Sequence, residues 1–197
     1  METLNLAMVE LEQMVELTKN AVPRQKKWFE DMLKVAKPIT ISRIKDVLTP
    51  EQIEEIQEII KPEKKQCYRN AHLLTCLYPE WEYCEGKVCA PFGIDHAFNK
   101  VGDKYIDITF ELALNDDPTK YDYAVIGEYT AQEVEEVALE TGVYGEIYRH
   151  KYMKSQCCAN CKYHGKAMMC CFNDRNEGMR VMNPNNQTCE YFEPKTN

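Results

Sequence analysis

The stretch QCYRNAHLLTCLYPEWEYCEGKVCAPFGIDHAFNKVGDKYIDIT, residues 66–109, carries the strongest structural signal in this chain. Residues 67–77 repeat apolar side chains at helical spacing and are followed by Pro79, so they predict one helix. Extended segments after this helix predict three strands, at residues 81–89, 95–101 and 104–110. A helix followed by antiparallel strands indicates the α+β fold class.

A two-residue loop, Gly102-Asp103, joins the last two predicted strands, and glycine in its first position favours a type II′ turn. The pairs expected to face one another are Val101 with Lys104, Phe98 with Asp107, and His96 with Thr109. His96 and Asp107 are then diagonal neighbours on one face, about 7 to 8 Å apart at the backbone. A slip of one residue would put them on opposite faces, so the register of the hairpin decides whether they meet.

The residues before this stretch are expected to be helical. Apolar residues at helical spacing predict helices over residues 3–19 and after Pro23. A capping box begins a third helix at Thr49, and Pro62 ends it. The N-terminal helices either cover the cleft of the following domain or form the contact of a homodimer.

The residues after the stretch divide into two parts. A second capping box begins a helix at Thr130, which Gly142 ends, and residues 143–150 are expected to add a strand. Further along, periodicity is lost and cysteines are frequent. The expected division is a core with its N-terminal helices at residues 1–153, centred on 62–112, and a cysteine-rich module at 154–197.

Composition excludes several classes of protein. The 197 residues carry a net charge of −8 with pI ≈ 5.1, so the chain lacks the basic face that a broad nucleic-acid surface needs. No stretch approaches the roughly 18 to 20 apolar residues of a membrane span, and the first residues lack the features of a secretory signal. We therefore expect a cytoplasmic protein. Its ten cysteines then stay reduced, and clustered ones act as metal ligands or in catalysis.

Cys67 is the candidate nucleophile. It stands at the start of a predicted helix, where unpaired N–H groups and the helix dipole lower the pKa of a thiol. Lys64 and Lys65, which precede it by two to three residues, favour the thiolate as well. His96, polarised by Asp107 on the neighbouring strand, is a competent base for such a thiol.

The order of four motifs, QCYRNA, YCEG, DHAFN and YIDIT, resembles the transglutaminase-like branch of the papain-like cysteine fold. In that family a Cys opens a helix packed on an antiparallel sheet, His follows on the next strands, and Asp comes one hairpin later in a D-x-T string. The resemblance assigns these positions to Cys67, His96 and Asp107, with Phe98 where the family often has Trp. The segment is also similar to small bacteriophage and prophage proteins that carry C-Y-x-N-A, Y-x-E-G and H-A-[FW].

The resemblance implies thiol-dependent acyl transfer, or hydrolysis of an amide or peptide bond in a protein or small substrate. Cys67 would attack a carbonyl as thiolate, His96 would accept and return the proton, and Asp107 would hold the imidazole in its tautomer. The nature of the acyl acceptor stays open, whether water or an amine.

Other candidate residues surround Cys67. Its backbone N–H and the side-chain amides of Gln66 or Asn70 are expected to bind the oxyanion. Glu85 is expected to line the cleft. Packing alone is the alternative for Asn70, and a solvated strand position is the alternative for Glu85. His72 projects about 140° away from Cys67 on the helix, which makes it the weaker base candidate.

Residues 157–194 hold the other six cysteines. Cys158 and Cys161 form a C-x2-C knuckle, and four thiolates are the usual number around one structural zinc. The segment resembles small phage-associated modules of the form C-x-x-C-K-Y, C-x-N and P-x-x-x-C-x-x-[FW]-E-P, which implies a Zn²⁺ held by Cys158, Cys161, Cys171 and Cys189. Cys170 is the alternative third ligand and His164 a substitute. A disulfide pair or an iron–sulfur cluster is the alternative to zinc.

Two further functions stay open beside the enzymatic one. The chain could be a non-catalytic phage-encoded binding or inhibitor protein that keeps the fold without turnover. It could also be a zinc-dependent nucleic-acid adaptor that uses residues 151–197, whose net charge of +3 is slight for that purpose. We expect the cysteine enzyme, and nucleic acid is the least favoured partner.

Overall fold

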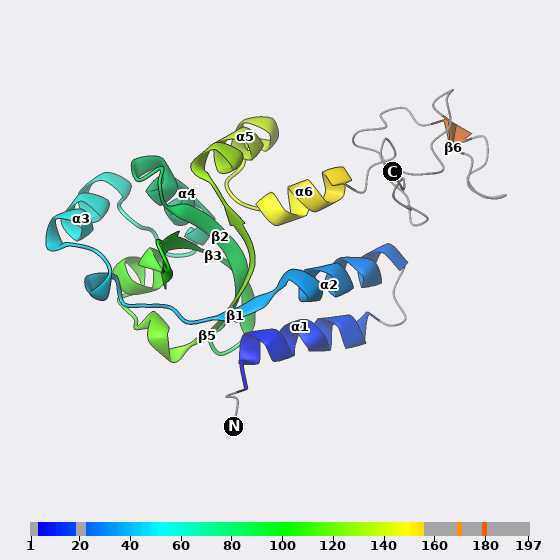
Figure 1. Ribbon diagram of the computed structural model, residues 1–197, viewed down its shortest axis with the longest axis horizontal. Helices are drawn as coiled ribbons and strands as arrows, with labels where there is room; N and C mark the ends of the chain where they lie inside the picture. Colours follow the sequence, from blue (N-terminus) through cyan, green and yellow to red (C-terminus); the bar gives the residue numbers. More distant parts are fainter. Residues whose placement is uncertain (1–3, 19–22, 156–168, 171–178, 181–197) are drawn as a thin grey trace.

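The structure, a computed structural model, describes residues 4–18, 23–155, 169–170 and 179–180. It is an α+β protein in which helices surround a five-stranded sheet that curls into a half-barrel (Figure 1). The helices are α1 (Leu6–Leu17), α2 (Pro23–Val35), α3 (Pro50–Glu55), α4 (Cys67–Leu77), α5 (Ala131–Thr141) and α6 (Ile147–Ser155). The strands of the sheet are β1 (Lys37–Ile39), β2 (Glu82–Cys89), β3 (Gly93–Val101), β4 (Lys104–Ile106) and β5 (Asp122–Tyr129). Two short strands, β6 (Met169–Cys170) and β7 (Met179–Arg180), pair separately.

The sheet has the order β1-β5-β2-β3-β4, and each pair of neighbouring strands is antiparallel. Successive residues of a strand point to opposite faces, so the core divides in two. One face packs against α4, α5 and α6 through Ala71, Tyr83, Ala97, Val134, Val137 and Ile147. The helices α1 and α2 cover the β5 end of that face through Ala7, Leu11, Met32, Ala124 and Ile126. The other face buries Cys84, Val88, Phe98, Tyr123 and Val125 against Ile41 and Phe110.

The predicted helix starts are confirmed. Thr49 accepts from the N–H of Gln52, and the Gln52 side chain accepts in return, which begins α3. Thr130 and Glu133 make the same capping box at the start of α5, and Gly142 ends α5 with a φ of +75°. The predicted helix at residues 67–77 is α4.

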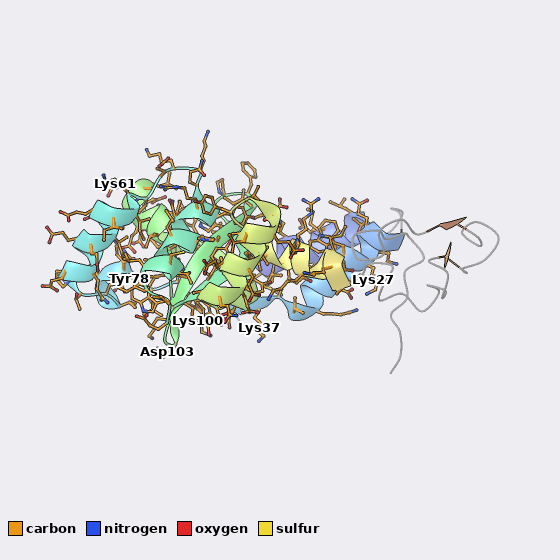
Figure 2. The ribbon with its side chains drawn as sticks, turned by 90° about the horizontal axis from the view of Figure 1, so that it is seen from above. Lys27, Lys37, Lys61, Tyr78, Lys100 and Asp103 are labelled. Carbon is orange, nitrogen blue, oxygen red and sulfur yellow. The ribbon has the colours of Figure 1, made fainter. Side chains whose placement is uncertain are left out.

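The predicted register of the hairpin between β3 and β4 is confirmed. Val101 lies opposite Lys104, and Asn99 lies opposite Ile106. In the connecting turn Gly102 has a φ of +60°, as a type II′ turn requires of its first central residue. The labelled Asp103 of this turn lies at the outer edge of the fold in Figure 2.

Two expected strands differ from the structure. The strand expected at residues 104–110 ends at Ile106, because the Asp107 carboxylate accepts from the N–H groups of Thr109 and Phe110 and turns the chain into a helical segment. The sheet pairs expected beyond Ile106 are therefore not formed. The strand expected at residues 143–150 is also wrong, since α6 begins there at Ile147.

A central strand was not foreseen. β5 lies between β1 and β2, and its residues 123–126 are buried. Next to it, Gly86 of β2 lies at a bulge, where an added Cβ would stand 1.9 Å from the Ala124 carbonyl oxygen. Only glycine allows the two backbones to approach so closely at this point.

Within the described residues, no helix is long and apolar enough to cross a membrane. The domain boundary expected near residue 153 falls inside α6, which continues to Ser155.

Candidate active site

Cys67 is the first residue of α4, and its side chain is partly exposed. The residue before it, Gln66, does not cap the helix, because no backbone N–H group at the start of α4 donates to the Gln66 side chain. Unpaired N–H groups at a helix start favour negative charge. The thiol is therefore placed where a thiolate is stabilised.

His96 and Asp107 meet as expected, although the strand pairs expected at Asp107 and Thr109 are not formed. The His96 Nε2 lies 2.6 Å from Oδ2 of Asp107, and both side chains are buried. Nδ1 is then the ring nitrogen left to exchange a proton with Cys67, whose thiol interacts with the imidazole. The three side chains therefore lie in sequence, from the partly exposed thiol through the imidazole to the buried carboxylate.

The Asp107 carboxylate is fully hydrogen-bonded. Oδ1 accepts from the N–H groups of Thr109 (2.9 Å) and Phe110 (3.0 Å). Oδ2 accepts from the Tyr123 hydroxyl at 2.9 Å as well as from His96. Burial raises the pKa of Tyr123, and the charge of Asp107 raises it further, so the phenol keeps its proton and donates. Tyr123 was missed in the sequence because it lies on β5, although its run of aromatic and β-branched neighbours was a strand signal.

The electrostatics favour an ion pair between thiol and imidazole. Burial raises the pKa of Cys67, but the hydrogen bond and charge of His96 and the backbone N–H of Ala97 lower it, and the net direction is downward. Burial lowers the pKa of His96, but Asp107 and Cys67 raise it, and the net direction is upward. A lowered thiol pKa and a raised imidazole pKa both favour the thiolate–imidazolium state.

Cys67 differs in this respect from the other cysteines whose side chains the structure describes. Burial raises the pKa of Cys76, Cys84 and Cys89, and nearby carboxylates raise each of them further. Among these four thiols, Cys67 is the one shifted toward the reactive form.

Asn70 positions the two segments that carry the site. Its Oδ1 accepts from the N–H of Glu63, and its Nδ2 donates to the Glu63 carbonyl (2.8 Å) and to Oγ1 of Thr109 (3.0 Å). Both ends of the amide are thus occupied by protein partners. The structure gives Asn70 a positioning role in place of the expected oxyanion contact.

Glu85 is buried, and its partners belong to α6. Oε1 accepts from the Tyr83 hydroxyl and from the N–H of Ile147, and Oε2 accepts from the N–H of Tyr148 at 2.8 Å. Burial raises the pKa of Glu85, and these hydrogen bonds oppose the rise. The alternative that Glu85 is a solvated strand residue is therefore wrong, since the Glu85 side chain caps α6 from the centre of the sheet.

The other two candidates are Gln66, next to Cys67 in the chain, and His72, five residues after it. Gln66 is exposed directly beside Cys67. His72 is buried one turn or more away, where its ring packs edge-on against Tyr144 at 5.0 Å between ring centroids. His72 therefore takes no part in the arrangement of Cys67, His96 and Asp107.

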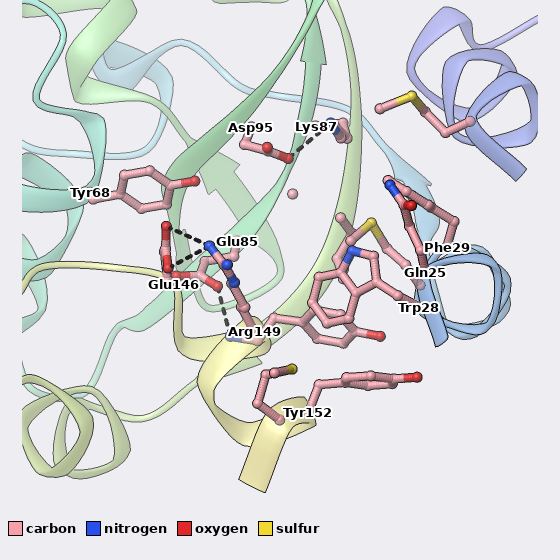
Figure 3. Close-up of a pocket in the computed structure, with 16 residues that line it drawn as sticks. Gln25, Trp28, Phe29, Tyr68, Glu85, Lys87, Asp95, Glu146, Arg149 and Tyr152 are labelled. Carbon is pink, nitrogen blue, oxygen red and sulfur yellow. Dashed lines mark hydrogen bonds and ion pairs between the residues drawn. The ribbon is translucent and has the colours of Figure 1, made fainter. Parts of the chain in front are cut away.

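A cavity of about 490 Å³ lies between the sheet and the helices α2 and α6 (Figure 3), and none of Cys67, His96 and Asp107 lines it. Glu85 and Lys87 of β2 line it from the sheet, and Trp28 of α2 and Tyr148 of α6 line it from the helices. Tyr68, the neighbour of Cys67, also lines it.

No group of metal-ligating side chains occurs within the described residues. The predicted zinc ligands Cys158, Cys161, Cys171 and Cys189 lie outside those residues, as does His164. For Cys170 only the backbone of β6 is described. The zinc site stays a prediction.

Comparisons of the chain with protein-family models, with curated proteins and with solved structures found no significant match.

Proposed function

We propose that the chain is a cysteine enzyme that cleaves or transfers the acyl group of an amide. The proposal is supported above all by the hydrogen bond between His96 and Asp107 next to Cys67, whose thiol is partly exposed at the start of α4. This arrangement of nucleophile, base and orienting carboxylate is what covalent catalysis by a thiol requires. It also favours the expected likeness to transglutaminase-like and papain-like proteins, which we retain as part of the proposal.

The proposed reaction has two steps. The Cys67 thiolate attacks the carbonyl carbon, and the C–N bond breaks as the His96 imidazolium gives its proton to the leaving amine. The resulting thioester is attacked by water or by an amine, which loses a proton to His96 as the C–S bond breaks. Asp107 acts as a positioning residue, because it keeps Nε2 protonated and Nδ1 aimed at the sulfur.

Negative charge on the carbonyl oxygen also needs donors. The backbone N–H of Cys67 at the start of α4 is the first of these, and the exposed Gln66 side chain beside it is the second. The proposal requires a reducing compartment such as the cytoplasm expected from the sequence, because only a free thiol can react.

The test is alkylation of the folded chain with iodoacetamide near neutral pH, followed by intact mass. We expect one rapid adduct on Cys67, about tenfold or more faster than on an ordinary thiol, of which only a few per cent is ionised at this pH. His96→Gln should remove this advantage, and the exposed Cys76 is the matched slow thiol within the same chain. Equal rates at Cys67 and Cys76 would contradict the proposal.

A further inference from the structure

The cavity between the sheet and the helices α2 and α6 has the size of a small-molecule site. Its volume is about 490 Å³, within the range usual for ligand pockets. Trp28 packs edge-on against Tyr152, with ring centroids 4.7 Å apart, and its ring centroid lies 5.1 Å from that of Tyr148. Figure 3 shows Trp28, Phe29 and Tyr152 on one side of the cavity and Tyr68 on the other. A molecule in the cavity therefore lies among aromatic side chains.

Carboxylates outnumber cations in this cavity. Among the described residues that line it, the carboxylates are Glu85, Asp95 and Glu146, and the cations are Lys87 and Arg149. Lys87 pairs with Asp95 at 2.9 Å, and Arg149 pairs with Glu146 at 3.2 Å. Each of these pairs is neutral as a whole, so Glu85 gives the cavity one negative charge in excess.

The partners of Glu85 carry no positive charge. Its side chain accepts from the Tyr83 hydroxyl and from the N–H groups of Ile147 and Tyr148, and within the described part of the chain it forms no ion pair. The start of α6 offsets about half of an elementary charge. Glu85 is 6% exposed, and a buried charge is screened less than a charge in water. A negative potential therefore remains in the cavity.

The Tyr68 hydroxyl on the opposite wall responds to this potential. Burial raises the pKa of Tyr68, and the charges of Asp95, Glu85 and Glu146 raise it further. All three carboxylates thus act on the same wall of the cavity, and each of them disfavours a second negative charge there. A ligand of positive charge is favoured for the same reason.

The hydrogen bonds of the cavity narrow the kind of cation. A primary ammonium group has three N–H donors, and each needs an acceptor when it leaves water. The buried carboxylate of Glu85 already accepts three hydrogen bonds, which leaves little capacity for such donors. A quaternary ammonium group has no N–H donor, and it is attracted by aromatic ring faces and by negative charge alone.

We propose that this cavity binds a small organic cation that carries a quaternary ammonium group on an apolar body. The ammonium group lies against the rings around Trp28, and the charge of Glu85 compensates it. The apolar body packs against Met14 and Met32, flexible side chains that also line the cavity. The inference goes beyond the proposed function and does not rest on it, because none of the three residues of the candidate active site lines this cavity.

The test is calorimetric titration of the full chain with four probes. Benzyltrimethylammonium and choline are quaternary cations, 3,3-dimethylbutan-1-ol has the shape of choline without its charge, and 3,3-dimethylbutanoate is the corresponding anion. We expect saturable binding of both cations, and a Kd for choline about tenfold or more below that of the alcohol, the effect of a desolvated cation on aromatic rings. The anion should bind most weakly.

Variants locate the binding in this cavity. Trp28→Leu should remove the preference for choline over the alcohol, and Trp28→Phe should retain it. Glu85→Gln should weaken choline and leave the alcohol unchanged. The matched control is Phe92→Leu, since Phe92 is 79% exposed and does not line the cavity, and it should alter nothing. Melting temperatures establish that each variant has folded.

Several results would overturn the inference. These are equal affinities of the wild type for choline and the alcohol, tighter binding of the anion, no saturable binding of either cation, or a folded Trp28→Leu that keeps the wild-type preference. Cys67→Ser should bind choline with the affinity of the wild type. A protein that binds the cations but lacks a reactive thiol would therefore keep this site and lose the proposed function.

Discussion

Replacing Asp107 with asparagine separates the charge of this residue from its shape. The carbonyl oxygen of asparagine can still accept from the N–H groups of Thr109 and Phe110, so the turn after β4 is kept. The NH2 group then faces Nε2 of His96 and the Tyr123 hydroxyl, which now bond to Oδ2. An amide NH2 cannot accept a hydrogen bond from Nε2–H, and the imidazolium loses its charged partner.

The size of the effect follows from the lost interaction. A hydrogen bond to a charged group contributes about 1.5–3 kcal/mol, and 1.36 kcal/mol corresponds to about one pKa unit. We expect the pKa of His96 to fall by about one to two units and the pKa of Cys67 to rise with it. The negative charge of Asp107 also raises the pKa of Cys67 directly, but this contribution is smaller than those of His96. The pKa of Cys67 should therefore rise, because losing the imidazolium changes it more than losing the charge of Asp107.

The assay is the rate of alkylation of Cys67 by iodoacetamide from about pH 5 to about pH 9, a range that brackets the ordinary Cys pKa of about 8.5. The wild-type rate should stay high well below that value, because the pKa of Cys67 is lowered. In Asp107→Asn the profile should move to higher pH, and the rate near pH 7 should fall about tenfold or more.

The control is Asp103→Asn, an exposed change in the hairpin turn, which should leave the profile in place. Melting temperatures of the variants establish that each has folded. A folded Asp107→Asn whose pH profile coincides with that of the wild type would refute the reasoning, because Asp107 would then have no electrostatic role.

Three further outcomes are expected. Glu85→Gln puts an NH2 group against a backbone N–H of α6, and should lower the free energy of unfolding by about 1–3 kcal/mol. The melting temperature should then fall by several degrees, and an unchanged melting temperature would show that Glu85 is dispensable. Gly86→Ala forces a Cβ to 1.9 Å from the Ala124 carbonyl oxygen. It should cost about 2 kcal/mol or more in urea unfolding, and a wild-type midpoint would show that β2 and β5 can separate there freely. Metal analysis of the full chain should find one zinc for every chain, lost in Cys161→Ser, and iron in place of zinc would indicate a cluster.

Local sequence predicts what local interactions decide. The Gly102-Asp103 turn and the alternation of the flanking residues give the register of β3 and β4, which brings His96 and Asp107 near each other. The contact itself also needs the turn at Asp107, which no strand pairing predicts. The capping boxes are local in the same sense. These features could be predicted because each is determined within about ten residues of the chain.

The features that the sequence did not predict depend on partners that are distant in the chain. α6 begins where Glu85, 62 residues earlier, accepts from the N–H of Ile147, and the sequence around Ile147 carries no such cap. β5 enters the middle of the sheet between strands that precede it in the chain. Tyr123 reaches Asp107 only because of that insertion, so its role in the site follows from topology rather than from a motif.

The turn at Asp107 has a consequence for how thiol reactivity reports on folding. One carboxylate ends β4, starts the next helical segment and holds His96, so the base of the site exists only when the hairpin is closed. Cysteines inside a core, such as Cys84, become more reactive when a protein unfolds, because reagent reaches them. Cys67 should respond in the opposite sense, because denaturation returns it to the thiol form of an ordinary cysteine. The ratio of alkylation at the two positions, measured in one sample along a denaturation series, therefore gives a chemical measure of the intact hairpin.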